Sequence, residues 1–485
     1  MRKINAVLTA VVVPAALFAA SCTVGPDYKP PQTKSPAQFS EIGSATRPTT
    51  QPAETSQALP DYRRWWTAFG DNRLNSLIDR AVKGNPDLIA AEARIREARA
   101  NRGVAASAYY PQVNANGSYS HSRQSSNQPA AAAFGGGGGF PGQETDMWQA
   151  GFDASWEIDV FGGTRRAVEA ADASIQAAIE DRRDVQVSLL AEVAINYVQL
   201  RGAQYDLVIV RHNLQSQEQT LALTRRKAEG GLIPYLDVAQ QEAQVATTAS
   251  QIPALETQIR QAIHRLGILL GQDPGALSEE LTPEAPIPVG PSSVPPGLPS
   301  ELLRRRPDVR RAERQLAAAT AQIGVATADL FPKFSITGAL GTQAANFRQL
   351  FDYSSRTYSI APGVTWDIFD AGRVKSNIDV QNARQVQALA AYVKTVLQSL
   401  QDVDDALVAY NREQVRLQSL RQAVQANERA VELSMELFEK GSKDFLSVLD
   451  AQRNLFAAQD AMARSEQQVA ADLIALYKAL GGGWE

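Results

Sequence analysis

Few side chains in this sequence are of the types that most often build catalytic or metal sites. The three histidines, His121, His212 and His264, lie far apart and share no spacing of metal ligands. Residues 402–405 hold three aspartates, but they fall in the middle of a predicted long helix, where a solvated or pore-facing patch is the simpler interpretation. No nucleophile elbow or comparable catalytic signature is present. We therefore predict that the protein is not an enzyme and needs no metal or other cofactor.

Two further clusters suggest a ligand at first sight. Six arginines gather within residues 304–314, yet the formal net charge of the chain is −4, so we predict one charged face at a helix start and no nucleic-acid partner. Five consecutive glycines at 135–139 are not followed by the Lys-Ser/Thr pair or the helix of a phosphate loop. They predict an exposed loop.

One residue predicts a specific modification. Cys22 is the only cysteine, and it follows a basic start, an apolar stretch and the small residues of a bacterial lipobox, so we expect its acylation, with palmitate among the attached groups. The alternative is a cleaved export signal followed by an unmodified thiol. We predict a signal peptide over 1–21 and, over 22–60, an extended, mostly unstructured lipidated tether rich in Pro, Thr, Ser and Gln. In many bacteria an aspartate directly after the lipidated cysteine retains a lipoprotein in the inner membrane. This chain has Thr23 at that position, which favours the outer membrane.

The elements that must position any site occur twice. Shifted by 221 residues, the segment 85–117 matches 306–338 without a gap, and shifted by 210, the segment 231–271 matches 441–481. Two matching blocks in the same order indicate duplication. The predicted organisation is therefore a first repeat, a Pro-rich linker and a second repeat, at 61–275, 276–296 and 297–485.

Each repeat predicts the same order of elements. A helix of about 25 residues ends near a proline, two strands follow, and a helix of more than 60 residues leads through a Gly-containing turn to another helix. At 1.5 Å per residue the long helices would span roughly 100 Å. The expected helices are 87–109, 164–228, 236–270, 308–331, 373–439 and 446–480. In the second long helix a coiled-coil seam is expected at Val386, Leu389, Val393, Val396, Leu400, Val403, Leu407 and Tyr410.

The second strand of each repeat alternates apolar and polar residues over about ten positions, which is the pattern of a membrane barrel strand. Aromatic residues lie eight positions apart near both ends of each strand, as an aromatic girdle at two membrane interfaces requires. These girdle residues are Trp148, Trp156, Tyr358 and Trp366. A soluble sandwich with one buried face is the alternative. In lipid, four strands cannot close a barrel, so this pattern requires several copies of the chain.

These features, with several sequence motifs, resemble the outer-membrane factor family, the TolC-like exit ducts of tripartite efflux pumps, and most closely its lipidated NodT-type drug-efflux branch. The resemblance covers nearly all of the mature chain. It rests on VGPDYKPP (24–31), LPSELLRRRPDVRRAE (298–313), LFPKFSITG (330–338), GSKDFLSVLDAQRNLFAAQ (441–459) and LYKALGGGW (476–484).

The resemblance implies a mixed α and β membrane protein. Each of the two tandem repeats would contribute two strands to a barrel in the cell outer membrane and long coiled-coil helices to a periplasmic α-barrel. Three copies would form a homotrimeric duct of 12 strands and 12 helices, anchored in outer-membrane lipid and extending into the periplasm. The implied partners are a periplasmic membrane-fusion adaptor and an inner-membrane RND-type pump. The exit duct of a type I protein-secretion system is the alternative function.

The resemblance also implies where the duct opens. The turns after the long helices would form tips that meet the adaptor, with Gly231, Leu232, Ile233, Gly441 and Ser442 as contact residues. A periplasmic gate would follow, formed by Asp450, Leu446, Lys443 and Asp237. Three symmetry-related carboxylates in a narrow pore repel anions and collect cations. Such a ring could lock or release an iris.

Overall fold

The computed structural model describes residues 23–31, 36, 39, 62–123, 144–292, 294 and 299–484. Cys22, the predicted signal peptide and the glycine run at 135–139 lie outside the described residues. The chain divides into two compact units. We call them the strand unit (Met1–Pro31, Arg96–Gln176 and Glu313–Ala390) and the helix unit (Gln32–Ile95, Ala177–Ala312 and Ala391–Glu485).

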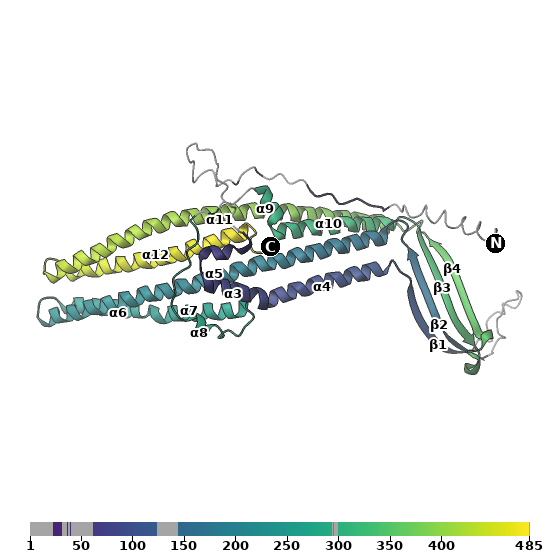
Figure 1. The fold of residues 1–485 in the computed structure, drawn as a ribbon, viewed down its shortest axis with the longest axis horizontal. Coiled ribbons are helices and arrows are strands. Elements are labelled where there is room, and N and C mark those ends of the chain that lie inside the picture. Colours follow the sequence, from purple (N-terminus) through teal and green to yellow (C-terminus); the bar gives the residue numbers. More distant parts are fainter. Residues whose placement is uncertain are drawn as a thin grey trace. The chain divides into compact units, whose positions relative to one another are not determined.

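The strand unit is built on one antiparallel sheet of order β1-β2-β3-β4 (Figure 1). Its strands are β1 (Gln112–Arg123), β2 (Glu144–Ile158), β3 (Lys333–Ala344) and β4 (Arg356–Thr365). Helices α4 (Pro86–Ser107) and α10 (Pro307–Ala328) precede β1 and β3, as predicted. Two short 3-10 turns, η2 (Phe347–Gln349) and η3 (Tyr353–Ser355), join β3 to β4.

The register of the sheet collects the apolar residues on one face. Phe152 pairs with Ala115 on one side and Leu340 on the other, and Leu340 pairs with Tyr358. The neighbouring row, on the opposite face, holds Asn114, Asp153, Ala339 and Ser359. Because alternate side chains of a strand point to opposite faces, the predicted alternation becomes one apolar and one polar surface.

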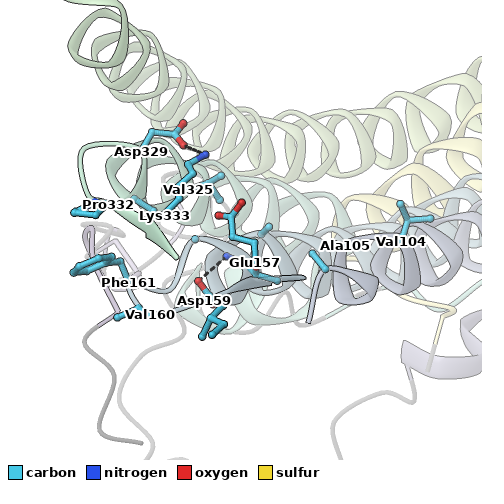
Figure 2. A pocket seen from close by; sticks show the side chains of 16 residues that line it. Val104, Ala105, Glu157, Asp159, Val160, Phe161, Val325, Asp329, Pro332 and Lys333 are labelled. Atoms are coloured by element: carbon cyan, nitrogen blue, oxygen red, sulfur yellow. Dashed lines mark hydrogen bonds and ion pairs between the residues drawn. The ribbon is translucent and has the colours of Figure 1, made fainter. Parts of the chain in front are cut away.

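A cavity of about 330 Å³ lies where the strands of this unit meet its helices (Figure 2). Three of its four charged side chains, Asp159, Asp329 and Lys333, have partners. Asp159 accepts hydrogen bonds from the backbone N–H groups of Thr164 (3.2 Å) and Arg165 (2.9 Å), and Lys333 pairs with Asp329 at 2.9 Å. Asp159 therefore caps the first turn of the following helix, because the first N–H groups of a helix lack intrahelical partners.

Residues 23–31 also belong to the strand unit. The N–H of Val24 donates to the carbonyl of Phe161 at 3.1 Å, and the hydroxyl of Tyr28 donates to Glu313 at 3.0 Å. Within the tether predicted over 22–60, this stretch therefore lies bound to the folded protein.

Two long helices, α5 (Gly163–Glu229) and α11 (Arg373–Glu439), each have 67 residues. In the helix unit α5 turns into α6 (Tyr235–Ala249), and α11 turns into α12 (Phe445–Ala479) (Figure 1). The other elements of this unit are η1 (Tyr62–Phe69), α3 (Asn72–Gly84), α7 (Gln251–Leu269), α8 (Ser278–Leu281) and α9 (Pro299–Arg305).

The helix predicted over 236–270 is two helices, α6 and α7, which meet at Ser250. Pro253 follows in the first turn of α7, where its missing N–H is tolerated but cannot continue the hydrogen bonding of α6. The equivalent α12 has no proline and is continuous. The predicted seam on α11 is buried at Val396, Val403, Leu407 and Tyr410, whereas Val386 and Val393 are exposed.

The core of the helix unit gathers around aromatic residues near its two chain ends. Trp65 of η1 stacks on Tyr477 of α12 with ring centroids 5.3 Å apart. The glycines of LYKALGGGW let the chain pass beside these rings, since a Cβ on Gly482 would lie 2.7 Å from the carbonyl oxygen of Tyr62. Gly483 adopts φ +103°, which favours glycine.

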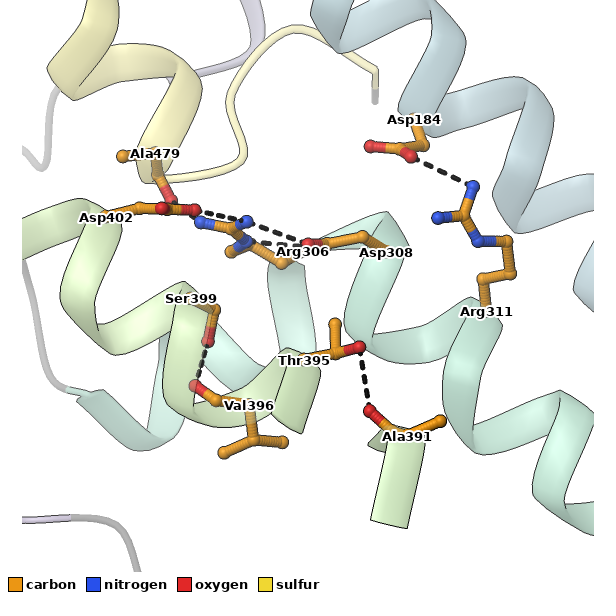
Figure 3. A network of polar contacts seen from close by, with 10 residues as sticks. All are labelled: Asp184, Arg306, Asp308, Arg311, Ala391, Thr395, Val396, Ser399, Asp402 and Ala479. Carbon is orange, nitrogen blue, oxygen red and sulfur yellow. Dashed lines mark hydrogen bonds and ion pairs between the residues drawn. The ribbon is translucent and has the colours of Figure 1, made fainter. Parts of the chain in front are cut away.

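Four of the six arginines within 304–314 pair with carboxylates, and Figure 3 shows two of them, Arg306 and Arg311. Arg306 contacts Asp308 at 2.7 Å and Asp402 at 2.9 Å, and it donates to the carbonyl of Ala479 at 3.1 Å. Arg311 contacts Asp184 at 3.0 Å. The prediction of one charged face is therefore wrong for Arg306, whose side chain is only 12 % exposed and which fastens α10 and α11 to the end of α12. Asp402 pairs with Arg306 but its side chain stays 51 % exposed, in agreement with the predicted solvated patch.

Candidate gate and membrane-facing sheet

Both turns between long and short helices use the same backbone motif. After α5, the N–H of Leu232 bonds to the carbonyl of Lys227 (2.9 Å), and the N–H of Gly231 bonds to that of Ala228 (3.0 Å). After α11, Ser442 and Gly441 make the equivalent bonds at 2.8 and 3.1 Å. Gly231 and Gly441 have φ of +70° and +73°. This is the Schellman arrangement, which requires a left-handed residue after the helix.

The second turn closes over a small apolar cluster of its own. Phe438 and Phe445 meet edge to face with ring centroids 5.6 Å apart, and Val448 and Leu449 complete the buried set. Ile233, from the first turn, packs against this cluster. The predicted tip residue Ile233 therefore helps to join the two turns.

Lys227 makes the polar link between the same turns. Its ammonium donates to the carbonyls of Phe438 (2.6 Å) and Glu439 (3.3 Å) and lies 4.3 Å from the centroid of the Phe438 ring. These carbonyls end α11, where a helix has unpaired acceptors and partial negative charge. A cation from the last turn of α5 thus satisfies the end of α11.

Most of the predicted gate residues are exposed in the single chain. Asp450 and Lys443 are exposed, and Leu446 is 49 % exposed. Within the described ranges no ion pair joins Lys443 to Asp450. Of the tip residues, Leu232 is 74 % exposed and Ile233 is half-buried.

Asp237 is the predicted gate residue whose protonation is perturbed. Its partial burial, and secondly the charge of Asp444 in the other turn, raise the pKa of the Asp237 carboxyl. Asp444 itself caps α12 by accepting from the N–H of Ser447. Hydrogen bonds from the hydroxyl and N–H of Ser447 lower the pKa of Asp444, so that it stays charged beside Asp237.

The predicted girdle residues lie near the two ends of β2 and β4, but not in two straight rows, because Tyr358 shares a register row with Phe152, midway between Trp148 and Trp156. Near one end, Trp156 and Trp366 donate their indole N–H to the carbonyls of Tyr109 (3.0 Å) and Leu330 (3.1 Å), just beyond α4 and α10. Toward the other end, Trp148 packs on Tyr119 with centroids 4.3 Å apart, and Tyr358 is 84 % exposed. Amphipathic rings with one satisfied polar group suit a boundary between water and lipid.

The described residues show little other chemistry. In them no three His, Cys, Asp or Glu side chains lie together as metal ligands. None of the helices whose residues are described is long and apolar enough to cross a membrane.

Comparison with known proteins assigns the family. The model of the family described as outer membrane efflux protein matches residues 77–272 and 298–482. The chain belongs to the outer membrane efflux protein family. It is 35 % identical to the pyoverdine export outer membrane protein OpmQ of Pseudomonas aeruginosa, over 88 % of each chain. It is 31 % identical to nodulation protein T of Rhizobium leguminosarum bv. trifolii, over 96 % of each.

A solved structure, that of the outer-membrane channel OprN, has the same fold. It superimposes with a TM-score of 0.85 at 37 % identity, over 96 % of this chain and all of that one. The efflux family resemblance predicted from the motifs is therefore confirmed, and the fold is that of TolC-like outer-membrane channels.

The structure also identifies residues of the two turns that the sequence analysis did not name as site residues. Phe445 and Phe438 form the core of the second turn, and Lys227 ties it to the first. The repeat alignment offered a hint, because Phe445 matches Tyr235 while Lys227 matches Leu437 at the same shift of 210 residues. Because a lysine in the first repeat matches a leucine in the second, the two repeats differ in chemistry at this position.

Proposed function

We propose that this chain is the outer-membrane channel of a tripartite efflux pump and that it passes small molecules from an inner-membrane RND-type transporter and a periplasmic adaptor to the exterior. The observation that carries the proposal is the sheet, with one apolar face on a chain of the outer membrane efflux protein family. Relatives named for pyoverdine export and for an outer-membrane channel support it.

We infer that three copies assemble into a 12-stranded barrel and a 12-helix tunnel. Strands β1 and β4 are the two edges of the sheet, and each would leave backbone N–H and C=O groups unpaired in lipid. Pairing β4 of one copy with β1 of the next satisfies both edges. Twelve strands enclose a channel, whereas eight leave an interior filled by side chains. Native mass spectrometry of the detergent-solubilised protein should give the mass of a trimer.

We also propose the two tandem repeats, at 61–275 and 297–485 with the linker 276–296 between them. The two separate matches of the family model support this division. The lipid anchor at Cys22, embedded in the outer membrane, belongs to the same proposal. Metabolic labelling with a palmitate analogue should mark the chain, and Cys22→Ser should abolish the label.

Asp450 is proposed as the gate carboxylate, with Leu446, Lys443 and Asp237 around it. It is exposed on α12 in the first turns after the Phe445 cluster, so that a neighbouring copy can reach it. An exposed charge is free to bond across a three-fold axis and to repel anions in a narrow pore. The turns with Gly231, Leu232, Gly441 and Ser442 are the proposed adaptor contacts.

Single-channel conductance in planar bilayers tests the gate. Asp450→Ala should raise conductance by about two-fold or more, because removing a ring of bonded charges at a constriction widens it and lowers its barrier. Glu432→Ala, an exposed carboxylate on α11, is the matched control and should leave conductance unchanged. If Asp450→Ala behaves like that control, Asp450 is not at the constriction.

A further inference from the structure

Residues 23–31, which we call the N-terminal strap, are held by one arginine at the start of α5. The Nε of Arg166 donates to the carbonyl of Val24 at 3.0 Å. Its Nη2 donates to the carbonyl of Gly25 at 3.3 Å and to Asp27 at 2.7 Å, and its Nη1 pairs with Glu169 at 2.7 Å. The Arg166 side chain is only 4 % exposed, whereas that of Asp27 is 83 % exposed.

Two glycines permit the strap to cross α10. A Cβ on Gly25 would overlap the Cα of Gly324, and a Cβ on Gly324 would lie 2.7 Å from Cγ of Arg166. Gly25 also has φ +88°, where other residues are strained. The strap then follows α10, since Tyr28 bonds to Glu313 and lies under the guanidinium of Arg314 at 5.6 Å.

The second repeat lacks this site at the corresponding place. Both long helices are entered through an aspartate–arginine pair six residues apart, Asp159–Arg165 at 3.2 Å and Asp367–Arg373 at 2.8 Å. The next residue is Arg166 in the first helix and Val374 in the second. The helix start that the two repeats share therefore does not require an arginine at the position of Arg166.

The matched glycines of the two repeats differ in the same way. Gly103 of α4 matches Gly324 of α10 at the repeat shift of 221 residues. A Cβ on Gly103 would meet nothing within 4 Å among the described atoms, in contrast to Gly324. At these two pairs of matched positions, the buried arginine and the crowded glycine are both on the side that contacts the strap.

We propose that the groove formed by Arg166 and Gly324 is a docking site for the chain's own N-terminal strap, and that docking holds Thr23, the first described residue, at the end of β2. A Cβ on Gly162 would lie 3.0 Å from the Cα of Thr23, so Thr23 lies beside the junction of β2 and α5. Where the preceding cysteine is acylated, which is part of the proposed function, its lipid is attached one residue from this fixed point, and consecutive Cα atoms are about 3.8 Å apart.

Spin-label mobility on the full-length, detergent-solubilised chain tests the docking. Lys29 is exposed, so a nitroxide on Lys29→Cys reports the strap without touching the groove. We expect an immobilised spectrum. In the same background, Arg166→Gln and Gly324→Val should raise the ratio of mobile to immobilised label about tenfold, since a lost charge-assisted hydrogen bond shifts an equilibrium by that order.

Two control variants change the same residue types elsewhere in the strand unit. Arg102→Gln breaks the exposed pair with Asp172 on the neighbouring helix, and Gly103→Val fills the open space on α4. Neither should change the spectrum. Asp27→Asn changes a side chain that is 83 % exposed and should raise mobility by a smaller factor. An immobile label in Arg166→Gln, Gly324→Val and Asp27→Asn, or equal mobility in the controls, would overturn the proposal.

The lipid is tested separately on the chain with Lys29 intact. If the sulfur of Cys22 carries a lipid, no thiol is left to label. Labelling of that chain would refute lipidation yet leave the docking result standing, because the contacts of the strap with Arg166 and Gly324 do not involve Cys22.

Discussion

The two turns that end the long helices share a backbone and differ in what they bury. Phe445, the first residue of α12, is 1 % exposed, whereas Tyr235, the first residue of α6 and its match in the first repeat, is 69 % exposed. Asp444 caps α12 through its side chain, but Pro234 makes no such bond before α6. The two repeats therefore share the backbone of the turn, but the matched aromatic residue is buried in the second turn and exposed in the first.

The difference indicates that the second turn stabilises the pair of turns, whereas the first turn presents an exposed apolar surface. The second turn packs its own aromatic pair, and Lys227 draws the first turn against it. The first turn exposes a row of large apolar side chains at Leu232, Tyr235 and Leu236, 64–74 % exposed. Exposed apolar groups at a rigid turn are typical of a contact surface. We expect the first turn to be the main apolar contact of each copy and the second to be its support.

Truncating the aromatic residue in each turn should break this comparison most clearly. Phe445→Ala should destabilise the second turn by about 3–5 kcal/mol, because it leaves a cavity beside Phe438 and Val448. Tyr235→Ala should change stability by less than about 0.5 kcal/mol. Hydrogen–deuterium exchange of residues 435–450 measures the effect. Equal protection in the two variants would contradict the division of roles.

A smaller effect is expected at the link between the turns. Lys227→Met keeps the apolar stem but removes two hydrogen bonds to the end of α11, at an expected cost of about 1–2 kcal/mol. Exchange should speed up in both turns, residues 228–234 and 438–444. Arg226→Met is the control, since the exposed Arg226 bonds to its own helix at Ala222. A change confined to the first turn would mean that Lys227 does not couple them.

Much of this architecture was predictable because it depends on local patterns. Alternation along β2 and β4 predicted the two faces of the sheet, and the repeat predicted two helices of more than 60 residues, which the structure has as α5 and α11. The break at Ser250 was missed although Pro253 is visible in the sequence, because a proline in a first turn does not interrupt an apolar pattern.

Contacts between distant segments were not predictable in the same way. The arginines at the start of α10 were predicted to form an exposed charged face. The side chain of Arg306 is nevertheless only 12 % exposed, because it pairs with Asp402, which lies nearly one hundred residues later in the sequence. Docking of the strap likewise depends on Gly25 meeting Gly324, and nothing local to either glycine indicates the other. For the gate, Asp450 was identifiable only through the LDAQ motif of a family, since its own surroundings are those of any exposed helix carboxylate.

A third pair of matched positions distinguishes the long helices themselves. Asp206 of α5 lines a polar cavity of about 600 Å³ between α5, α7 and α12, and its Oδ1 has no hydrogen-bond partner among the described residues. Arg416, the matching residue of α11, is exposed and pairs with Glu413 at 3.1 Å. Burial, and secondly the charge of Asp460, raises the pKa of Asp206 to about 6, although Arg464 opposes the shift.

This shift predicts the smallest effect, and one that depends on pH. The folded state holds the Asp206 proton more tightly than the unfolded state, where the carboxyl has its ordinary pKa near 3.8. The stabilisation it contributes is therefore complete below about pH 4 and is lost as pH rises through about 6. Asp206→Asn mimics the protonated acid, so it should raise stability at pH 7.5 by about 1 kcal/mol, a value reduced for partial solvent screening.

Thermal unfolding of the purified protein at pH 4 and pH 7.5 measures this difference. At pH 4 the variant and the parent chain should unfold together, and at pH 7.5 the variant should unfold at the higher temperature. Asp405→Asn makes the same chemical change at an exposed site on α11 and should have no effect at either pH. A gain at pH 4 as large as that at pH 7.5 would show that the Asp206→Asn substitution acts through packing. Protonation of the Asp206 carboxyl would then not be a difference between α5 and α11.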